Sequence, residues 1–137
     1  MNIAVQTLDI PTRGSGLHDV TEAVGAWLAG QEARQGLLTI VCPHTSASLL
    51  IQGRDEDMKA DLEAFFVRLA PQVAGLYDHD IDGPDDMPAH IRAALTQVQL
   101  GVPVIDGALA LGRGQGIYLF EHRTDPQRRQ ALLHLIW

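Results

Sequence analysis

An α+β fold in a single domain is what the sequence predicts, and three observations support this prediction. Short apolar stretches rich in Val, Ile and Leu alternate along the chain with segments whose apolar residues recur at helical spacing. The 137 residues correspond to one domain of ordinary size, without an internal repeat or a low-complexity linker. Hydrophobic residues account for 46% of the chain but aromatic residues for only 5%, so we expect an aliphatic core. We therefore predict one domain that spans residues 1–137.

The first half of the chain predicts strands on either side of one helix. Residues 2–10 alternate loosely between apolar and polar side chains, as in a half-buried strand, and Pro11 ends this pattern. Residues 18–29 have helical spacing, with an apolar side formed by Val20, Val24, Trp27 and Leu28. Residues 37–51 are apolar at both ends, which predicts buried strands. Between those ends, the polar segment CPHTSAS at residues 42–48 interrupts the strand character.

The second half predicts two helices and three strands. Residues 55–69 form an amphipathic pattern whose apolar stripe comprises Met58, Leu62, Phe65, Phe66 and Leu69. A shorter helix is predicted over residues 88–96, because proline suits the first position of a helix. The two aspartates just before it, Asp85 and Asp86, suit the positive end of the helix dipole. Strands are then expected at residues 102–105, 115–121 and 130–136.

The charge of the chain argues against some classes of function. A formal net charge of −7 disfavours general nucleic-acid binding, which needs clustered Lys and Arg side chains. Lys59 is the only lysine, so the other nine basic residues are arginines. Recognition of a phosphate or a carboxylate would then depend on arginine, whose planar guanidinium binds such groups bidentately.

The sequence also predicts where the protein acts. No apolar run approaches the ~18 residues of a membrane-spanning helix, and the N-terminus lacks the pattern of a signal peptide. The single cysteine, Cys42, lies in the predicted core and cannot form an internal disulfide. We therefore expect a cytoplasmic protein without a membrane partner.

Four of the six histidines lie beside other polar residues at the edges of predicted elements. They are His44, His79, His90 and His122. Neutral imidazoles are common ligands of zinc and related metals, and a site with three of them leaves a position for water or substrate. Their spacing matches no zinc motif, however, and a single histidine is more often structural than a ligand. The pattern therefore predicts a shared site and leaves its chemistry open.

Five motifs occur in the order found in one family of small bacterial and archaeal proteins. They are His44-Thr45-Ser46-Ala47-Ser48, Tyr77-x-His79, Asp86-x-x-Ala89-His90, Leu111-Gly112-x-x-Gln115-Gly116-Ile117 and Glu121-His122-Arg123. Through these residues the chain, from about residue 2 to 136, resembles the YjbQ-like proteins, which are described as secondary thiamine-phosphate synthases. The resemblance implies a β-sandwich flanked by helices that assembles as a homotrimer.

The resemblance, together with the chemistry that such a reaction needs, indicates roles for individual residues. The ligands of a divalent metal, zinc or magnesium, would be His44, His79 and His90. The residues expected to handle a proton as catalytic groups are Glu121 and His122. The residues expected to bind substrate are Thr45, Ser46, Ser48, Gln115 and Arg123, the last as a partner of a phosphate. An ion pair with an aspartate of residues 78–86 is the alternative role of Arg123.

Three functions stay open on this basis. The first is a transferase that joins hydroxymethylpyrimidine diphosphate to thiazole phosphate, releasing pyrophosphate and giving thiamine phosphate. The second is a histidine-bound metal that activates water for hydrolysis or hydration. The third is a trimeric, non-catalytic binder of a small phosphorylated or heteroaromatic metabolite. Arg113-Gly114 stands where relatives usually carry Thr-Trp, a difference that bears on the identity of the substrate more than on the fold.

Overall fold

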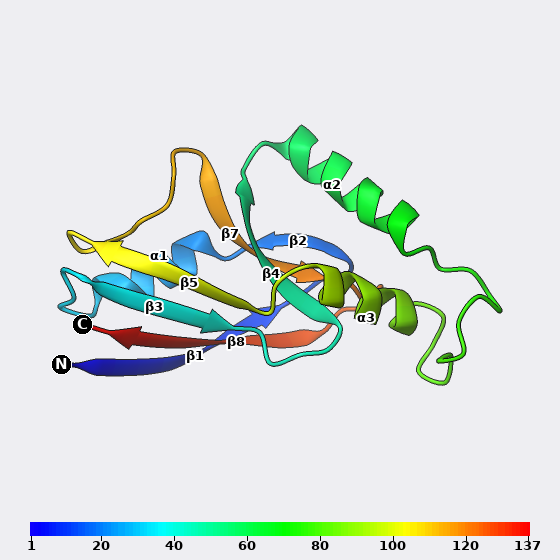
Figure 1. Cartoon of the computed structure of the whole chain (residues 1–137), viewed down its shortest axis with the longest axis horizontal. Coiled ribbons are helices and arrows are strands. Elements are labelled where there is room, and N and C mark those ends of the chain that lie inside the picture. Colours follow the sequence, from blue (N-terminus) through cyan, green and yellow to red (C-terminus); the bar gives the residue numbers. More distant parts are fainter.

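Two antiparallel sheets form the body of the protein, whose computed structural model describes residues 1–137. The larger sheet has the strand order β1-β8-β3-β5-β6, with bounds Ile3–Pro11, Arg128–Ile136, Gly36–Val41, Gln99–Ile105 and Ala108–Leu109. The smaller sheet has the order β2-β7-β4, with bounds Gly16–Asp19, Gln115–Glu121 and Ala47–Gly53. Because β1 and β8 pair along their whole lengths, the two ends of the chain lie side by side (Figure 1).

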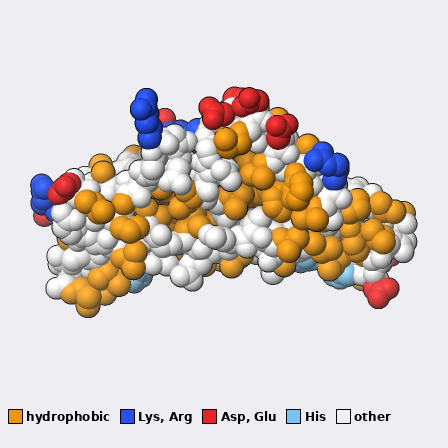
Figure 2. All heavy atoms as spheres, turned by 45° about the horizontal axis from the view of Figure 1, so that its top comes forward, with side chains coloured by type: hydrophobic (Ala, Val, Ile, Leu, Met, Phe, Trp, Pro, Cys, Tyr) orange, Lys and Arg blue, Asp and Glu red, His pale blue; other side chains and the backbone are white.

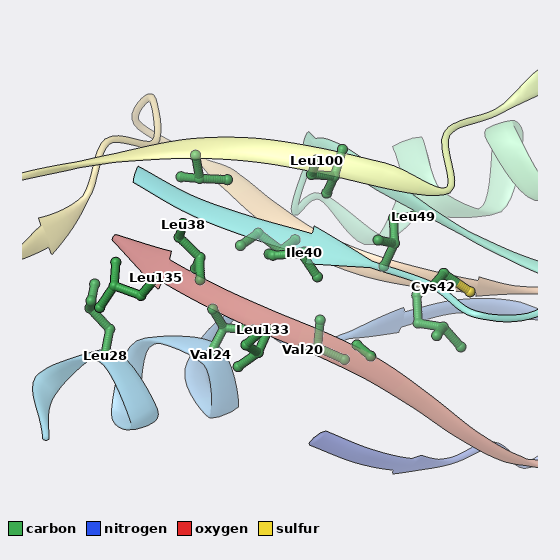
Figure 3. Close-up of a cluster of buried hydrophobic side chains, with 14 of the residues drawn as sticks. Val20, Val24, Leu28, Leu38, Ile40, Cys42, Leu49, Leu100, Leu133 and Leu135 are labelled. Carbon is green, nitrogen blue, oxygen red and sulfur yellow. The ribbon is translucent and has the colours of Figure 1, made fainter. Parts of the chain in front are cut away.

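The two sheets enclose one aliphatic core. In β5 and β8 buried residues alternate with more exposed ones, as expected when one face of a sheet is covered. The buried apolar residues of these two strands are Leu100, Val102, Val104, Ala131, Leu133 and Leu135. They form one cluster with Leu49 of the smaller sheet and with Leu28 of the first helix (Figure 3). The core therefore holds both sheets in one unit.

Three helices flank the sheets. α1 (Thr21–Ala29) contributes buried residues to the core. α2 (Glu56–Leu69) covers the outer side of the smaller sheet, where the ring centroids of Phe66 and Phe120 are 5.4 Å apart. α3 (Asp86–Leu95) is fixed to the end of α2 by Arg92, whose guanidinium donates to two backbone carbonyl oxygens there. None of the three is long and apolar enough to cross a membrane.

The architecture confirms the predicted α+β fold with a β-sandwich and flanking helices. The helix predicted over residues 88–96 begins two residues earlier, at Asp86, so Pro88 lies in its first turn and not at its first position. β2 and β6, with four and two residues, are too short for the sequence period to be recognised.

The polar segment 42–46 is the place where the chain passes from the larger sheet to the smaller one. β3 ends at Val41 in one sheet and β4 begins at Ala47 in the other. This crossing segment lies beside α3 and β8, because His90 and Gln130 both form hydrogen bonds with it. Polar side chains between two apolar strands therefore lie at the ends of the strands, where they contact neighbouring elements.

Candidate metal centre

Three side chains from α3 and from the acidic loop before it meet at the surface of the protein. They are His79, Asp86 and His90, whose potential ligand atoms all lie within 4.8 Å of one another. Oδ2 of Asp86 lies 2.8 Å from Nε2 of His79 and 2.9 Å from Nε2 of His90. The Asp86 side chain is only 6% exposed, whereas the imidazoles are 42% and 31% exposed. The group is therefore open to solvent on its imidazole side.

The local sequence explains why these three residues meet. Asp86 and His90 are four residues apart on α3, so their side chains lie on one face of the helix. His79 comes from the loop between α2 and α3, which turns at Gly83 with a φ of +107°, a conformation that favours glycine. The Tyr77 hydroxyl donates to the carbonyl oxygen of Pro71 at 2.6 Å and fixes the start of this loop. The turn then brings His79 back to the first turn of α3.

The hydrogen bonds of His90 determine which of its nitrogens carries a proton. Nδ1 lies 3.0 Å from the carbonyl oxygen of Thr45. Because a carbonyl oxygen can only accept, Nδ1 is protonated. Nε2 is therefore the nitrogen that faces Oδ2 of Asp86, at 2.9 Å. This nitrogen can hold either a proton, which forms an ion pair with the carboxylate, or a metal ion.

Arg123 holds the second oxygen of the Asp86 carboxylate. Its Nη1 donates to Oδ1 of Asp86 at 2.7 Å, and its Nε donates to Oδ2 of Asp85 at 3.0 Å. Burial raises the pKa of Asp86, but the hydrogen bond from His79 and the charges of His90 and Arg123 outweigh it. The pKa therefore lies below the ordinary value of 3.8. Asp86 is an ionised carboxylate whose orientation is set by the guanidinium behind it, as is common for the ligands of metal sites.

The structure brings together two of the three histidines that were predicted as metal ligands. His44 lies outside the group, and its Nε2 accepts a hydrogen bond from the backbone N–H of Gln130 at 2.9 Å. The third member of the group is Asp86 instead. The signal that identifies Asp86 is its spacing of four residues from His90 within a helix, which places both side chains together.

Glu121, predicted as a catalytic residue, lies in the interior with no exposed surface. Nη2 and Nε of Arg129 donate to its two carboxylate oxygens at 2.6 and 2.7 Å, and the Thr12 hydroxyl donates to Oε2 at 2.9 Å. Burial raises the pKa of Glu121, but these hydrogen bonds and the Arg129 charge lower it below the ordinary value of 4.5. In this structure the carboxylate joins β7 to β8 and to the end of β1, and both of its oxygens are engaged by these groups.

The residues predicted to bind substrate lie in different surroundings. Ser46 is buried, and its hydroxyl accepts a hydrogen bond from the same guanidinium that binds the interior carboxylate. Gln115 accepts from the backbone N–H three residues before it at 2.6 Å and so closes its own turn. Arg123 pairs with the acidic loop, as in the ion-pair alternative. Of these residues, Thr45 is exposed beside the candidate metal centre.

A chain of buried hydrogen bonds begins at His122, the other residue predicted as catalytic. Its Nε2 lies 2.8 Å from Oγ of Ser48, which lies 2.6 Å from Oγ1 of Thr96. The Thr96 hydroxyl donates to Oγ of Ser48 and also lies 2.8 Å from the carbonyl oxygen of Arg92. Nδ1 of His122 is buried without a hydrogen-bond partner.

Replacing His122 by glutamine is expected to change how the free energy of unfolding depends on pH. Burial, followed by the charge of Arg92, lowers the pKa of His122 from 6.5 to about 3 in the folded protein. The unfolded chain therefore takes up a proton between these values that the folded chain does not. The contribution of His122 to the free energy of unfolding is therefore complete above pH 6.5. It is lost as the pH falls, and the loss reaches about 2 kcal/mol at pH 5.

Urea unfolding at pH 7 and at pH 5 checks this expectation. The wild type should lose more stability between the two pH values than His122→Gln, whose uncharged amide can still form a hydrogen bond with Ser48. Equal losses in the two proteins would show that His122 does not contribute to the pH dependence.

The fold and the side-chain group together define a small antiparallel β-sandwich protein with a candidate metal centre. Residues 6–137 match the family model described as "UPF0047 protein YjbQ-like". UPF0047 protein sll1880 of Synechocystis sp. is 41% identical over 131 residues, which cover 95% of this chain and 89% of that protein. UPF0047 protein YjbQ of Salmonella typhimurium is 39% identical over 132 residues, or 95% of each chain. The chain therefore belongs to the UPF0047 YjbQ-like family.

Solved structures have the same fold. A conserved hypothetical protein from Thermus thermophilus superposes with a TM-score of 0.85 at 32% identity, covering 96% of this chain and 99% of that one. A YbjQ-like protein of unknown function from Sulfolobus solfataricus gives a TM-score of 0.86 at 19% identity, covering 98% of each chain. None of these names specifies a reaction.

Proposed function

We propose that the protein is a cytoplasmic metal-dependent enzyme whose divalent ion binds His79, Asp86 and His90. The observation that carries this proposal is the convergence of one potential ligand atom from each of these three residues within 4.8 Å. Groups outside the cluster hold two of its members, since the Thr45 carbonyl fixes the His90 imidazole and Arg123 fixes the Asp86 carboxylate. Two imidazoles and one carboxylate are the donor set of catalytic zinc and of non-haem iron sites, whereas magnesium prefers oxygen ligands. We therefore favour zinc, or a related transition metal, over magnesium.

The arrangement suits hydrolysis or hydration. An ion in this site would act as a Lewis acid that activates water or polarises a carbonyl oxygen. The three side chains occupy only part of a coordination sphere, and the exposed imidazole side leaves room for a substrate. Oδ2 of the exposed Asp82 lies 3.5 Å from Nε2 of His79, so this carboxylate is placed to accept a proton released at the centre.

Synthesis of thiamine phosphate from hydroxymethylpyrimidine diphosphate and thiazole phosphate is the second candidate, which the resemblance supports. This transferase reaction needs positive charge on a diphosphate leaving group. All three nitrogens of the Arg123 guanidinium already donate hydrogen bonds, to Asp85, to Asp86 and to the carbonyl oxygen of Asp82. The metal ion alone would then have to neutralise the diphosphate, so we rank this reaction below hydrolysis.

Hydrolysis of p-nitrophenyl acetate by zinc-loaded and EDTA-treated protein tests the proposal. We expect a rate that EDTA abolishes, that zinc restores and magnesium does not, and that is absent in His90→Ala. The same preparations, given the two thiamine precursors, test the second candidate through the release of pyrophosphate. Ester hydrolysis at the same rate with and without EDTA would contradict a metal-dependent enzyme.

We further propose that the protein is a homotrimer. Large apolar side chains are exposed on α2 and on the segment after it: Phe65, Val67, Leu69, Val73, Leu76 and Ile81. Figure 2 shows that apolar side chains occupy a large part of one face of the protein. Contact with other copies of the chain would remove this surface from water, which is favourable.

Light scattering at micromolar concentration measures the assembly directly. We expect a mass three times the 14.9 kDa of one chain. We also expect Phe65→Glu to lower this mass, because a charge on the exposed apolar surface opposes burial. A wild-type mass equal to one chain would contradict the trimer.

A further inference from the structure

A wide, open surface cleft of about 600 Å³ lies beside the candidate metal centre. Its walls come from the crossing segment 42–46, from α3 and from the residues that follow α3. His90 belongs both to this wall and to the metal group. Other wall residues are His44, Thr45, Ala93, Ala94 and Val98. A compound bound in the cleft would therefore reach the metal ion from the His90 side.

His44 presents a hydrogen-bond donor of fixed identity in this cleft. Its Nε2 accepts the backbone N–H of Gln130 at 2.9 Å, so this nitrogen carries no proton. The single proton of the neutral imidazole is then on Nδ1. No group of the chain accepts a hydrogen bond from Nδ1. The imidazole therefore offers one N–H that only a bound molecule or solvent can use.

The cleft contains no cationic side chain. The guanidinium of Arg123 is bound to the acidic loop, and that of Arg129 is buried against Glu121. The only lysine, Lys59, is on α2, 3.8 Å from a carboxylate oxygen of Glu56. Arginine and lysine are the side chains that usually recognise phosphate groups. The wall of this cleft therefore suits an uncharged molecule and not a diphosphate.

We propose that His44 is a substrate-binding residue that donates its Nδ1–H to the carbonyl oxygen of a small uncharged ester or amide. This proposal rests on the function proposed above, since the same compound would meet the metal ion beside His90. The apolar part of the wall, which includes Ala94 and Val98, accommodates the hydrocarbon portion of the compound. His44 would thus select the substrate and would not bind the metal.

The experiment compares the wild type with His44→Phe and His44→Asn, all loaded with zinc. The phenylalanine ring fills the space without a donor, whereas the asparagine amide keeps an N–H close to the position of Nδ1. For p-nitrophenyl acetate we expect KM to rise about 3- to 10-fold in His44→Phe, the effect of one hydrogen bond, and to stay near the wild-type value in His44→Asn. The zinc Kd, measured by calorimetry, should agree within about twofold among the three proteins.

Two outcomes would overturn the proposal. An unchanged KM in His44→Phe would mean that the imidazole does not contact the ester. A loss of zinc affinity in His44→Phe would make His44 a metal ligand. The dianion p-nitrophenyl phosphate tests the class of substrate, and its hydrolysis with a higher kcat/KM than the acetate would also overturn the proposal.

A measurement without zinc separates this proposal from the proposed function. In a ¹H–¹⁵N spectrum of the histidine side chains of the metal-free protein, His44 should show the tautomer protonated at Nδ1. Addition of N-methylacetamide should shift this Nδ1 signal, and addition of inorganic pyrophosphate should not. If zinc fails to bind while these shifts occur, the metal centre fails and the role of His44 stands. If zinc binds and the His44 signal does not respond to the amide, the role of His44 fails alone.

Discussion

Replacing Glu121 by glutamine is expected to lower the free energy of unfolding by about 3–5 kcal/mol. The carboxylate is fully buried and binds the buried guanidinium of Arg129 through two hydrogen bonds. Glutamine keeps the size of the side chain but removes the negative charge, so a buried cation would be left uncompensated. In thermal unfolding this corresponds to a fall in Tm of roughly 10–20 °C for a chain of this length.

Two further variants make this prediction specific. Glu32→Gln, at an exposed position between α1 and β3, should change the free energy of unfolding by no more than about 0.5 kcal/mol. The double variant Glu121→Leu with Arg129→Met should recover much of the lost stability, because an apolar pair of similar volume can replace a buried ion pair. A Glu121→Gln protein that unfolds like the wild type would show that the pair contributes nothing. If Glu121→Gln kept its stability but lost its activity, Glu121 would be a catalytic residue, as the sequence predicted.

Replacing His90 by alanine is expected to weaken zinc binding by more than about 100-fold. Changes to residues that only support a ligand already cost about 10–100-fold in metal affinity, and loss of a ligand costs more. The loss of zinc affinity in Arg123→Lys should lie within the range of about 10–100-fold, since a lysine cannot bridge Asp85 and Asp86 as the guanidinium does.

Calorimetric titration with zinc measures both effects. His134→Ala, on β8, is the matched control, since it removes an imidazole that does not belong to the metal group, and it should leave the affinity unchanged. If His90→Ala and His134→Ala bind zinc equally well, the ion does not bind where we place it.

The sequence pattern was sufficient for the main elements of the fold. The apolar stripe of residues 55–69 has a clear helical period, and α2 occupies Glu56–Leu69. The strand predicted over residues 115–121 coincides with β7. The pattern does not predict which strands pair with each other: β1 pairs with β8, which lies at the opposite end of the chain. Such pairing depends on contacts between residues far apart in sequence, which periodicity does not describe.

For the site, the sequence indicated residue types but not their partners. His79 and His90 stood out as histidines in polar surroundings, and the structure brings them together. Asp86 was interpreted as a favourable charge at a helix end and as part of a family motif, but not as a ligand, although it also contacts His90. The partners of the other candidates come from distant segments: Gln130 for His44 and Ser48 for His122. Only folding reveals that these groups are already engaged elsewhere.

Anomalous diffraction at the zinc edge, from crystals grown with zinc, tests the central claim most directly. We predict one strong peak per chain, about 2.0–2.2 Å from Nε2 of His79, Nε2 of His90 and Oδ2 of Asp86. The His44 imidazole should keep its hydrogen bond to Gln130 in the same crystals. A peak coordinated by His44, or no peak at the three side chains when zinc is bound elsewhere on the protein, would contradict the account.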